Sequence, residues 1–168
     1  MNKIRVAVKA SKEVSEGQFI VCARTDARGV YGIEETVKRA KLYIDAGADM
    51  IFPEGLTSLD EFRFVSSELR KHNKDILLLA NMTEFGKTPY INVVDFKAVG
   101  YNCVIYPVST LRIASRAIDD FLTELKDTGS QETELGNMQT RKELYSSLQY
   151  EPGKEWFFPT PINKDTNK

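Results

Sequence analysis

The stretch Phe19-Ile-Val-Cys-Ala-Arg-Thr-Asp26 is an apolar run that ends abruptly in polar and charged residues. It is too short to form a helix of its own and is rich in residues that favour strands, so it predicts a buried β-strand over residues 19–25. A turn around Gly29 follows directly. A buried strand that ends in charged residues is typical of the active-site edge of a parallel α/β sheet or barrel.

Three further segments repeat this design. Short apolar runs occupy residues 49–54, 76–81 and 103–108, and polar residues end each run or follow it. Amphipathic periodicity predicts helices over residues 4–14, 34–46, 58–72, 93–98 and 109–128. Ser58 and Glu61 have the spacing of a capping box at the start of the third of these helices. Strand–helix units at intervals of about 25 to 30 residues predict a parallel sheet with helical crossovers.

The expected fold is α/β, of the (β/α)8 or TIM-barrel family. Polar strand ends and crossovers of one hand fit either part of such a barrel or an open sheet. A full barrel needs about 250 residues, whereas this chain has 168, so its four units make half of one. Residues 1–129 are assigned to this partial barrel, residues 130–150 to a C-terminal helical segment, and residues 151–168 to a tail. In the long helix over 109–128, one stripe is predicted to be buried: Leu111, Ala114, Ile118, Phe121 and Leu125.

The composition excludes several classes of protein. With 23 Lys and Arg against 24 Asp and Glu, the chain has no net charge that would attract nucleic acid or an acidic membrane. No apolar run approaches the roughly 20 residues that span a bilayer, and the first residues lack the apolar core of a secretory signal. We expect a cytoplasmic protein, with the mitochondrial matrix left open. Cys22 and Cys103 are expected to be buried and inert rather than catalytic, because neither has a flanking His or Lys.

Alternation along the predicted strands brings three polar side chains to one face. Arg24, Glu54 and Asn81 end consecutive strands in phase, so they are predicted to converge at the rim of the barrel. An arginine there can bind a substrate carboxylate through two parallel hydrogen bonds. A glutamate can act as a base or hold a metal-bound water. Thr83 and Arg112, just beyond the third and fourth strands, can add a hydroxyl donor and a further positive charge.

A purely structural explanation of each residue is open beside this one. Arg24 can simply pair with Asp26 at a strand end, Glu54 can be a solvated loop acid, and Asn81 can form a turn. The sequence has no glycine-rich phosphate loop, no Ser-His-Asp set and no clustered aspartates for direct metal ligation. The residues alone therefore predict a site for a small anionic molecule on a βα scaffold.

Five longer motifs follow one another along the chain and contain most of these candidates. They are Cys22-Ala-Arg-Thr-Asp-Ala27, Ala46-Gly-Ala-Asp-Met-Ile-Phe-Pro-Glu54, Leu79-Ala-Asn-Met-Thr-Glu-Phe-Gly-Lys-Thr-Pro89, Ile105-Tyr-Pro-Val-Ser109 and Met138-Gln-Thr-Arg-Lys-Glu-Leu-Tyr145. Together they resemble the C-terminal half of the 2-methylisocitrate lyases, in the isocitrate lyase and phosphoenolpyruvate mutase superfamily. The resemblance extends over about residues 4–150. The Asn81-Met-Thr-Glu-Phe-Gly86 loop resembles the methylisocitrate branch rather than the isocitrate lyases or phosphonate mutases.

The resemblance implies a Mg²⁺-dependent retro-Claisen cleavage of a small tricarboxylate, 2-methylisocitrate, to pyruvate and succinate. Arg24 and Glu54 are the implied catalytic residues: Arg24 binds substrate and balances the developing enolate, and Glu54 contacts substrate and reaches the metal through water. The other implied substrate-binding residues are Asn81, Met82 and Thr83 on the succinate side, and Arg112 and Arg141 at substrate carboxylates. The resemblance also implies a homo-oligomer in which residues 130–150 pack on a neighbouring subunit.

The chain departs from this family pattern in one large respect. The aspartates around the metal and the mobile loop with the acid thiol, Lys-Arg-Cys-Gly-His, belong to the first half of these enzymes and are not found here. Cys22 and Cys103 lie in strands and cannot replace a mobile cysteine. We therefore expect the chain alone to be inactive, as a truncated product or one piece of a split enzyme, and to associate through its open sheet edges. The alternatives are a non-catalytic half-barrel partner or scaffold, and a relative that acts on oxaloacetate or phosphonopyruvate.

Overall fold

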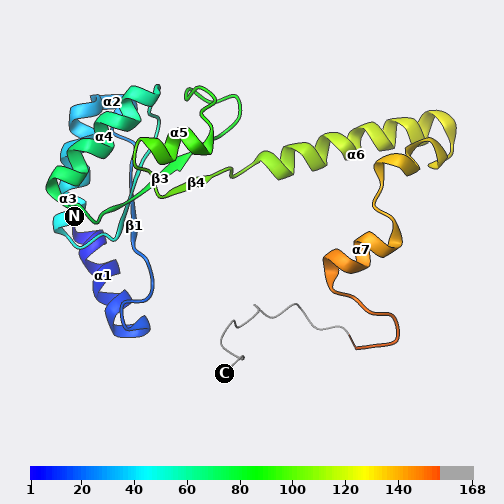
Figure 1. The fold of residues 1–168 in the computed structure, drawn as a ribbon, viewed down its shortest axis with the longest axis horizontal. Coiled ribbons are helices and arrows are strands. Elements are labelled where there is room, and N and C mark those ends of the chain that lie inside the picture. The colour runs from blue at the N-terminus through cyan, green and yellow to red at the C-terminus, as the bar shows by residue number, and fades with distance from the viewer. Residues whose placement is uncertain (156–168) are drawn as a thin grey trace. The chain divides into compact units, whose positions relative to one another are not determined.

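A computed structural model describes residues 1–155 of the protein (Figure 1). The chain forms two compact units, of which the first is residues 1–113 and the second begins at residue 114. The first unit holds the whole sheet and the candidate site. The predicted tail lies outside the described residues from residue 156 onward. The predicted functional division at residues 129 and 150 stays a prediction.

The predicted parallel sheet is confirmed. Its strands are β1 (Cys22–Thr25), β2 (Met50–Pro53), β3 (Leu77–Asn81) and β4 (Cys103–Ile105). They lie in the order β1-β2-β3-β4, each parallel to the next. A helical crossover joins each pair, so all the carboxyl ends of the strands lie at the same edge.

The helices agree closely with the predicted periodicity. In the first unit they are α1 (Asn2–Ser15), α2 (Arg28–Tyr31), α3 (Ile33–Asp45), α4 (Leu59–His72) and α5 (Val93–Ala98). The long helix α6 (Ser109–Thr128) is followed by a 3₁₀-helix, η1 (Glu132–Asn137), and by α7 (Arg141–Leu148). The predicted capping box at α4 is half formed. Ser58 accepts a hydrogen bond from the backbone N–H of Glu61, but the Glu61 carboxylate accepts from the backbone N–H of Thr57 instead of returning to Ser58.

The hydrophobic core lies between one face of the sheet and the helices α3, α4 and α5. In β1, β2 and β3, every second residue is buried on that face, for example Ala23, Ile51 and Leu78. Phe62 of α4 packs edge-to-face on Phe96 of α5, with ring centroids 5.0 Å apart. Each fully buried large aliphatic side chain of this core, such as that of Ile51 or Leu78, stabilises the fold by about 1.5–3 kcal/mol. The alternate residues, including Arg24 and Asn81, lie on the other face.

Two expectations about burial, for residues 19 and 20 and for the two cysteines, are wrong. The strand β1 begins at Cys22, and Phe19 and Ile20 before it are 69% and 52% exposed. Cys22 is exposed and Cys103 is half-buried, so the expectation that both thiols are buried is wrong. Both cysteines lie on the face turned away from the core, in register with Met50 and Leu79.

The prediction that one stripe of α6 is buried is also wrong, as far as the described residues 1–155 show. Leu111 and Ile118 are 64% and 57% exposed, Ala114 is exposed, and Phe121 and Leu125 are half-buried. An apolar periodicity indicates a face that needs a partner, and within its own unit this face is only partly covered, at Phe121 and Leu125.

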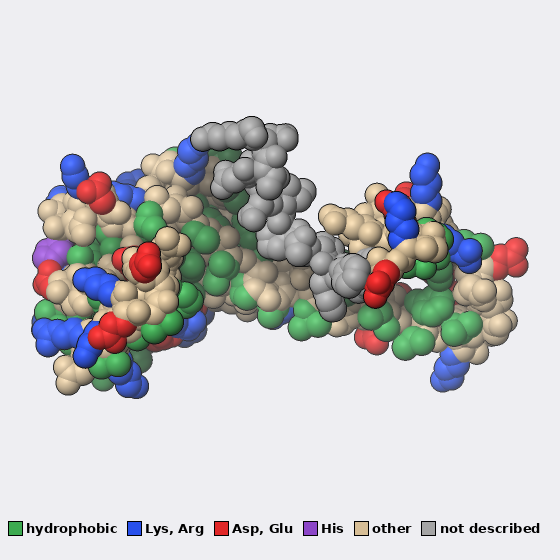
Figure 2. All heavy atoms as spheres, turned by 90° about the horizontal axis from the view of Figure 1, so that it is seen from below, with side chains coloured by type: hydrophobic (Ala, Val, Ile, Leu, Met, Phe, Trp, Pro, Cys, Tyr) green, Lys and Arg blue, Asp and Glu red, His purple; other side chains and the backbone are tan. Residues whose placement is uncertain are grey.

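The surface carries charges of both signs. Figure 2 shows Lys and Arg interspersed with Asp and Glu over the visible face, in agreement with the balanced composition. Among the described residues, none of the helices combines the length and apolarity that a bilayer crossing requires.

Candidate functional site

The register of the sheet brings Arg24, Glu54 and Asn81 together at one edge. Arg24 is paired with Phe52, two residues before Glu54, so Arg24 and Glu54 lie on the same face. The β2–β3 register pairs Met50 with Leu77. The same spacing puts Glu54 level with Asn81, and the predicted convergence of the three side chains is confirmed as geometry.

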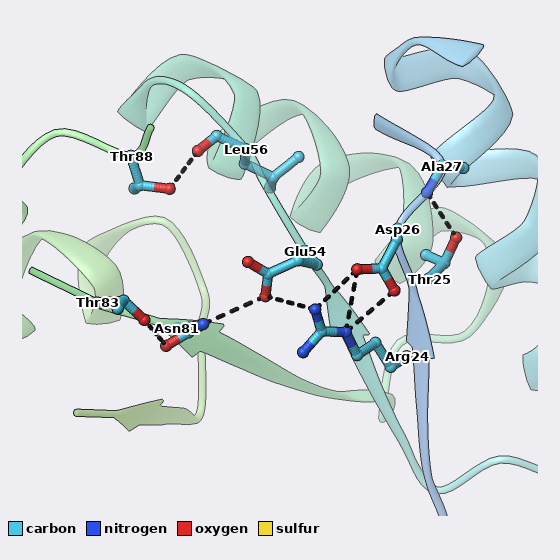
Figure 3. Close-up of polar contacts among 9 residues, drawn as sticks. All are labelled: Arg24, Thr25, Asp26, Ala27, Glu54, Leu56, Asn81, Thr83 and Thr88. Carbon is cyan, nitrogen blue, oxygen red and sulfur yellow. Dashed lines mark hydrogen bonds and ion pairs between the residues drawn. The ribbon is translucent and has the colours of Figure 1, made fainter. Parts of the chain in front are cut away.

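One oxygen of Glu54 joins the three residues (Figure 3). The Asn81 amide donates a hydrogen bond from Nδ2 to Glu54 Oε2 over 3.3 Å. Arg24 Nη2 lies 3.6 Å from the same Oε2 atom. Thr83 donates from its hydroxyl to Asn81 Oδ1 over 2.7 Å, which fixes the orientation of the amide. The cluster therefore presents a guanidinium, a carboxylate and an amide around one point.

Arg24 also makes the pair with Asp26 that the structural explanation predicts. Its Nε lies 3.0 Å from Asp26 Oδ2, and its Nη2 lies 2.7 Å from Oδ1. This hydrogen bonding raises the pKa of Arg24 and lowers the pKa of Asp26. The guanidinium also lies over the Phe52 ring, with Cζ 4.9 Å from the centroid. Because the Arg24 side chain is 50% exposed, we regard these contacts as orienting the group more than as stabilising the fold.

The loop that begins with Glu54 is held from both sides by residues that the sequence reasoning missed. Arg28, after β1, binds the Glu61 carboxylate and the Thr57 hydroxyl. On the other side, the Thr88 hydroxyl donates to the carbonyl oxygen of Leu56 over 2.6 Å. Only the capping pattern of Glu61 pointed to any member of this network, because the partners are far apart in the sequence.

The remaining predicted residues have different surroundings. Met82 is 5% exposed, and its thioether accepts the backbone N–H of Ile91 at 3.4 Å, so its side chain supports the loop from the core. Arg112 lies in the first turn of α6, with Nε 3.8 Å from Glu84 Oε2. Arg141 begins α7 in the second unit and is exposed. A role in substrate binding stays a prediction for all three.

The described residues do not fit a magnesium site by themselves. Within residues 1–155, no three His, Cys, Asp or Glu side chains lie close enough together to hold a metal ion. Glu54 and Asp26, the two carboxylates of the cluster, are both engaged by Arg24. That Glu54 reaches a metal through water, and that the direct ligands lie in another part of the enzyme, stays a prediction.

Comparison with known proteins assigns the chain to a family. The sequence pattern of the phosphoenolpyruvate phosphomutase family matches residues 1–126. The chain belongs to this family. A 2-methylisocitrate lyase of Aeropyrum pernix is 47% identical over 150 residues, which cover 89% of this family member and 46% of the relative. A 2-methylisocitrate lyase of Bacillus subtilis is 46% identical over 143 residues, which cover 85% of this chain and 46% of the relative.

Solved structures of the same superfamily share the fold. The crystal structure of 2,3-dimethylmalate lyase, a PEP mutase/isocitrate lyase superfamily member, is 34% identical with a TM-score of 0.73, over 85% of this chain and 48% of the other. A crystal structure of oxaloacetate acetylhydrolase has the same sequence identity of 34% and the same TM-score of 0.73. The match covers 85% of this chain and 48% of the other. The expected α/β fold of the TIM-barrel family is confirmed, and this family member spans about half the length of the relatives it matches.

Proposed function

We propose that this chain is the substrate-clamping half of a 2-methylisocitrate lyase. The observation that carries the proposal is the meeting of Arg24, Glu54 and Asn81 at the ends of three adjacent strands. Its support is the identity of 46–47% to 2-methylisocitrate lyases over most of the chain. A small carboxylate substrate suits the site, because a guanidinium and an amide are hydrogen-bond donors to carboxylate oxygens.

Each residue of the cluster has a separate task in the proposed cleavage. As the carbon–carbon bond of the hydroxy acid breaks, the hydroxyl gives its proton to the Glu54 carboxylate and the pyruvate carbonyl forms. The electron pair of the broken bond moves to the succinate carbon, which then takes up a proton from a donor in the complementary half. Arg24 faces the negative charge that develops, and Asp26 and Phe52 hold its guanidinium in place. Glu54 accepts a hydrogen bond from the substrate hydroxyl through the oxygen not used by Asn81. Asn81 donates its second N–H to the carboxylate of the succinate portion, and the Thr83 hydroxyl holds the amide in the required orientation.

A complementary half supplies the rest of the chemistry in this proposal. We assign the metal ligands and the proton donor for the succinate carbon to that half, as the family resemblance implies. A magnesium ion bound there would act as a Lewis acid toward the substrate oxygens. The chain alone is accordingly inactive, and its open sheet edges pair with further strands in an oligomer. We assign it to the cytoplasm, with the mitochondrial matrix as the alternative.

The test is pyruvate release from 2-methylisocitrate with Mg²⁺. The chain is assayed alone, and then with the separately expressed half of the Bacillus subtilis relative that it does not match. We expect no turnover by the chain alone and measurable turnover by the pair. The substitution Arg24→Ala is expected to abolish the turnover by the pair. Turnover by the single chain contradicts the inactivity, and an inactive but assembled pair favours a non-catalytic scaffold.

A second candidate is a relative that acts on oxaloacetate. It is favoured by the equal TM-scores of 0.73 for oxaloacetate acetylhydrolase and 2,3-dimethylmalate lyase. The same assembled pair separates the two candidates, because acetate and oxalate form from oxaloacetate only if this second candidate is right. Sedimentation of the chain alone tests the proposed association, and a clean monomer contradicts it.

A further inference from the structure

A carboxylate in the loop after β3 is tied to the first turn of α6. The Ser109 hydroxyl donates a hydrogen bond to Oε1 of Glu84. The other oxygen, Oε2, lies 3.8 Å from Nε of Arg112. All three residues belong to the first compact unit, so this contact joins two neighbouring βα segments at the edge that carries the candidate site.

The second oxygen of Glu84 is buried without a hydrogen-bond partner among the described residues. A buried carboxylate oxygen is costly unless an opposite charge compensates it. Arg112 is the cation that lies against it. The hydrogen bond from Ser109 is the main cause that lowers the pKa of Glu84, and Arg112 adds to it, so the carboxylate is charged at neutral pH.

The aromatic ring of Phe85 lies against the Arg112 guanidinium. Cζ of Arg112 lies 5.1 Å from the centroid of the Phe85 ring. The ring is 85% exposed, and the backbone φ of Phe85 is 61°, in the left-handed region. A bulky residue rarely adopts this conformation and retains it only where surrounding contacts enforce it. The loop is therefore shaped so that an exposed aromatic ring lies under the guanidinium.

Arg112 differs in one respect from the other arginines of this edge. Arg24 and Arg28 each make several hydrogen bonds to a carboxylate. Arg112 makes no side-chain hydrogen bond within residues 1–155, although it is held at ion-pair distance by Glu84 and stacked on Phe85. Its N–H donors, five in a guanidinium, are thus oriented but unused, which is the state needed to receive an anion.

We propose that Glu84 is a positioning residue that, together with Ser109, holds Arg112 over the Phe85 ring and presents its guanidinium to a carboxylate of the substrate. The proposal rests on the proposed function, because it assigns Arg112 to a substrate carboxylate. It adds a reason for the acidic residue in the loop. Glu84 directly follows Thr83, whose hydroxyl orients Asn81, so the contact with Ser109 anchors the chain next to that hydroxyl.

The test uses the full chain and the tricarboxylate tricarballylate as a probe. The Nε–H signal of Arg112 is followed by NMR in arginine-labelled protein and is identified by its loss in Arg112→Lys. The variants are Glu84→Gln, Ser109→Ala and the conservative Ser109→Thr, which keeps the hydroxyl. Glu13→Gln, on the exposed face of α1, is the matched control.

In the unaltered chain, the Arg112 signal is expected to move as the pH falls through the lowered pKa of Glu84. Glu84→Gln removes this movement and weakens tricarballylate binding by about fivefold to tenfold. Ser109→Ala weakens binding in the same direction, Ser109→Thr restores it, and Glu13→Gln changes neither readout. The backbone spectrum shows whether each variant is folded.

The outcomes separate this proposal from the proposed function. If Arg112 keeps its pH-dependent movement in folded Glu84→Gln, Glu84 does not position it and the inference is overturned. If the unaltered chain binds no tricarballylate, the substrate assignment fails, yet the pH-dependent signal still decides whether Glu84 holds Arg112. Equal affinity in folded Glu84→Gln and in the unaltered chain also overturns the inference while leaving the anion site intact.

Discussion

Arg28 and Glu61 form a two-pronged ion pair that joins the segment after β1 to the first turn of α4. Arg28 Nη2 and Nε lie 2.7 Å and 3.0 Å from Glu61 Oε1. Glu61 Oε2 accepts the backbone N–H of Thr57 over 2.8 Å. Glu54 opens the short loop that this pair closes, so the pair limits how far the catalytic carboxylate of the proposed mechanism can move.

The first prediction concerns the acid stability of this pair. The Arg28 hydrogen bond lowers the pKa of Glu61 in the folded state. A carboxylate whose pKa is lower in the folded state than in the unfolded state stabilises the fold at pH values above the ordinary carboxyl pKa of about 4.3. This stabilisation is lost as the pH falls through the pKa of the folded state. Glu61→Gln should therefore lower Tm by about 3–6 °C at neutral pH and by much less near pH 3.

Thermal unfolding at both pH values checks this prediction. Glu13→Gln on α1 is the control, and we expect its Tm to stay close to that of the unaltered chain at neutral pH. A Tm difference for Glu61→Gln that is the same at both pH values would contradict the assigned role of the charge.

The second prediction concerns the geometry of Arg24. Lys in its place keeps the positive charge but cannot form two parallel hydrogen bonds to Asp26 from separate nitrogens, nor stack a planar group on Phe52. Arg24→Lys should weaken tricarballylate binding at least about tenfold and lower the activity of the complemented enzyme. Arg63→Lys, on the exposed side of α4, is the matched control. Affinity within about twofold of the unaltered chain would show that charge alone is sufficient at this position.

The cluster of Arg24, Glu54 and Asn81 was predictable from the sequence because parallel strands end at the same edge and side chains alternate between faces. The Arg28–Glu61 pair was not predictable in this way. Its partners are 33 residues apart, and their meeting depends on side-chain conformations that no periodicity encodes.

Burial was predictable only where the chain supplies its own partner. Ile51 and Leu78 face α3 and α4 and are fully buried, as their strands predict. Cys22 and the stripe of α6 around Ile118 have the same apolar pattern and are exposed. An apolar pattern specifies a surface to be covered, and the residues that cover it can lie in another segment or another chain.

The third prediction concerns the turn before β4. Gly100 has a φ of 89°, and a Cβ atom there would lie 2.6 Å from the hydroxyl oxygen of the buried Ser66. Gly100→Ala should lower the free energy of unfolding by at least about 2 kcal/mol, because it combines an unfavourable backbone conformation with a steric clash. Gly29→Ala is the control, since Gly29 lies in α2 with no atom within 4 Å of the added Cβ. We expect Gly29→Ala to be neutral or stabilising by up to about 1 kcal/mol in the same urea titration.

The fourth prediction concerns the reactivity of Cys22, which lies two residues before Arg24 on the face that carries the site. Desolvation, with a smaller contribution from Cys103, raises the pKa of the Cys22 thiol. Since the thiolate is the reactive form, iodoacetamide should modify Cys22 more slowly than a free peptide cysteine at neutral pH. The rate should continue to rise above pH 9, and peptide mass mapping should find Cys22 modified before the half-buried Cys103.

The same reaction reports on whether the open face becomes covered. If the complementary half completes the barrel, it covers the face of β1 that carries Cys22 and Arg24. Adding that half should then suppress alkylation of Cys22 in proportion to the pyruvate-forming activity that appears. Cys22→Ser, which leaves only Cys103, gives the background rate. Full reactivity of Cys22 in an active, assembled pair would contradict closure over this face, because a packed barrel interior excludes the reagent.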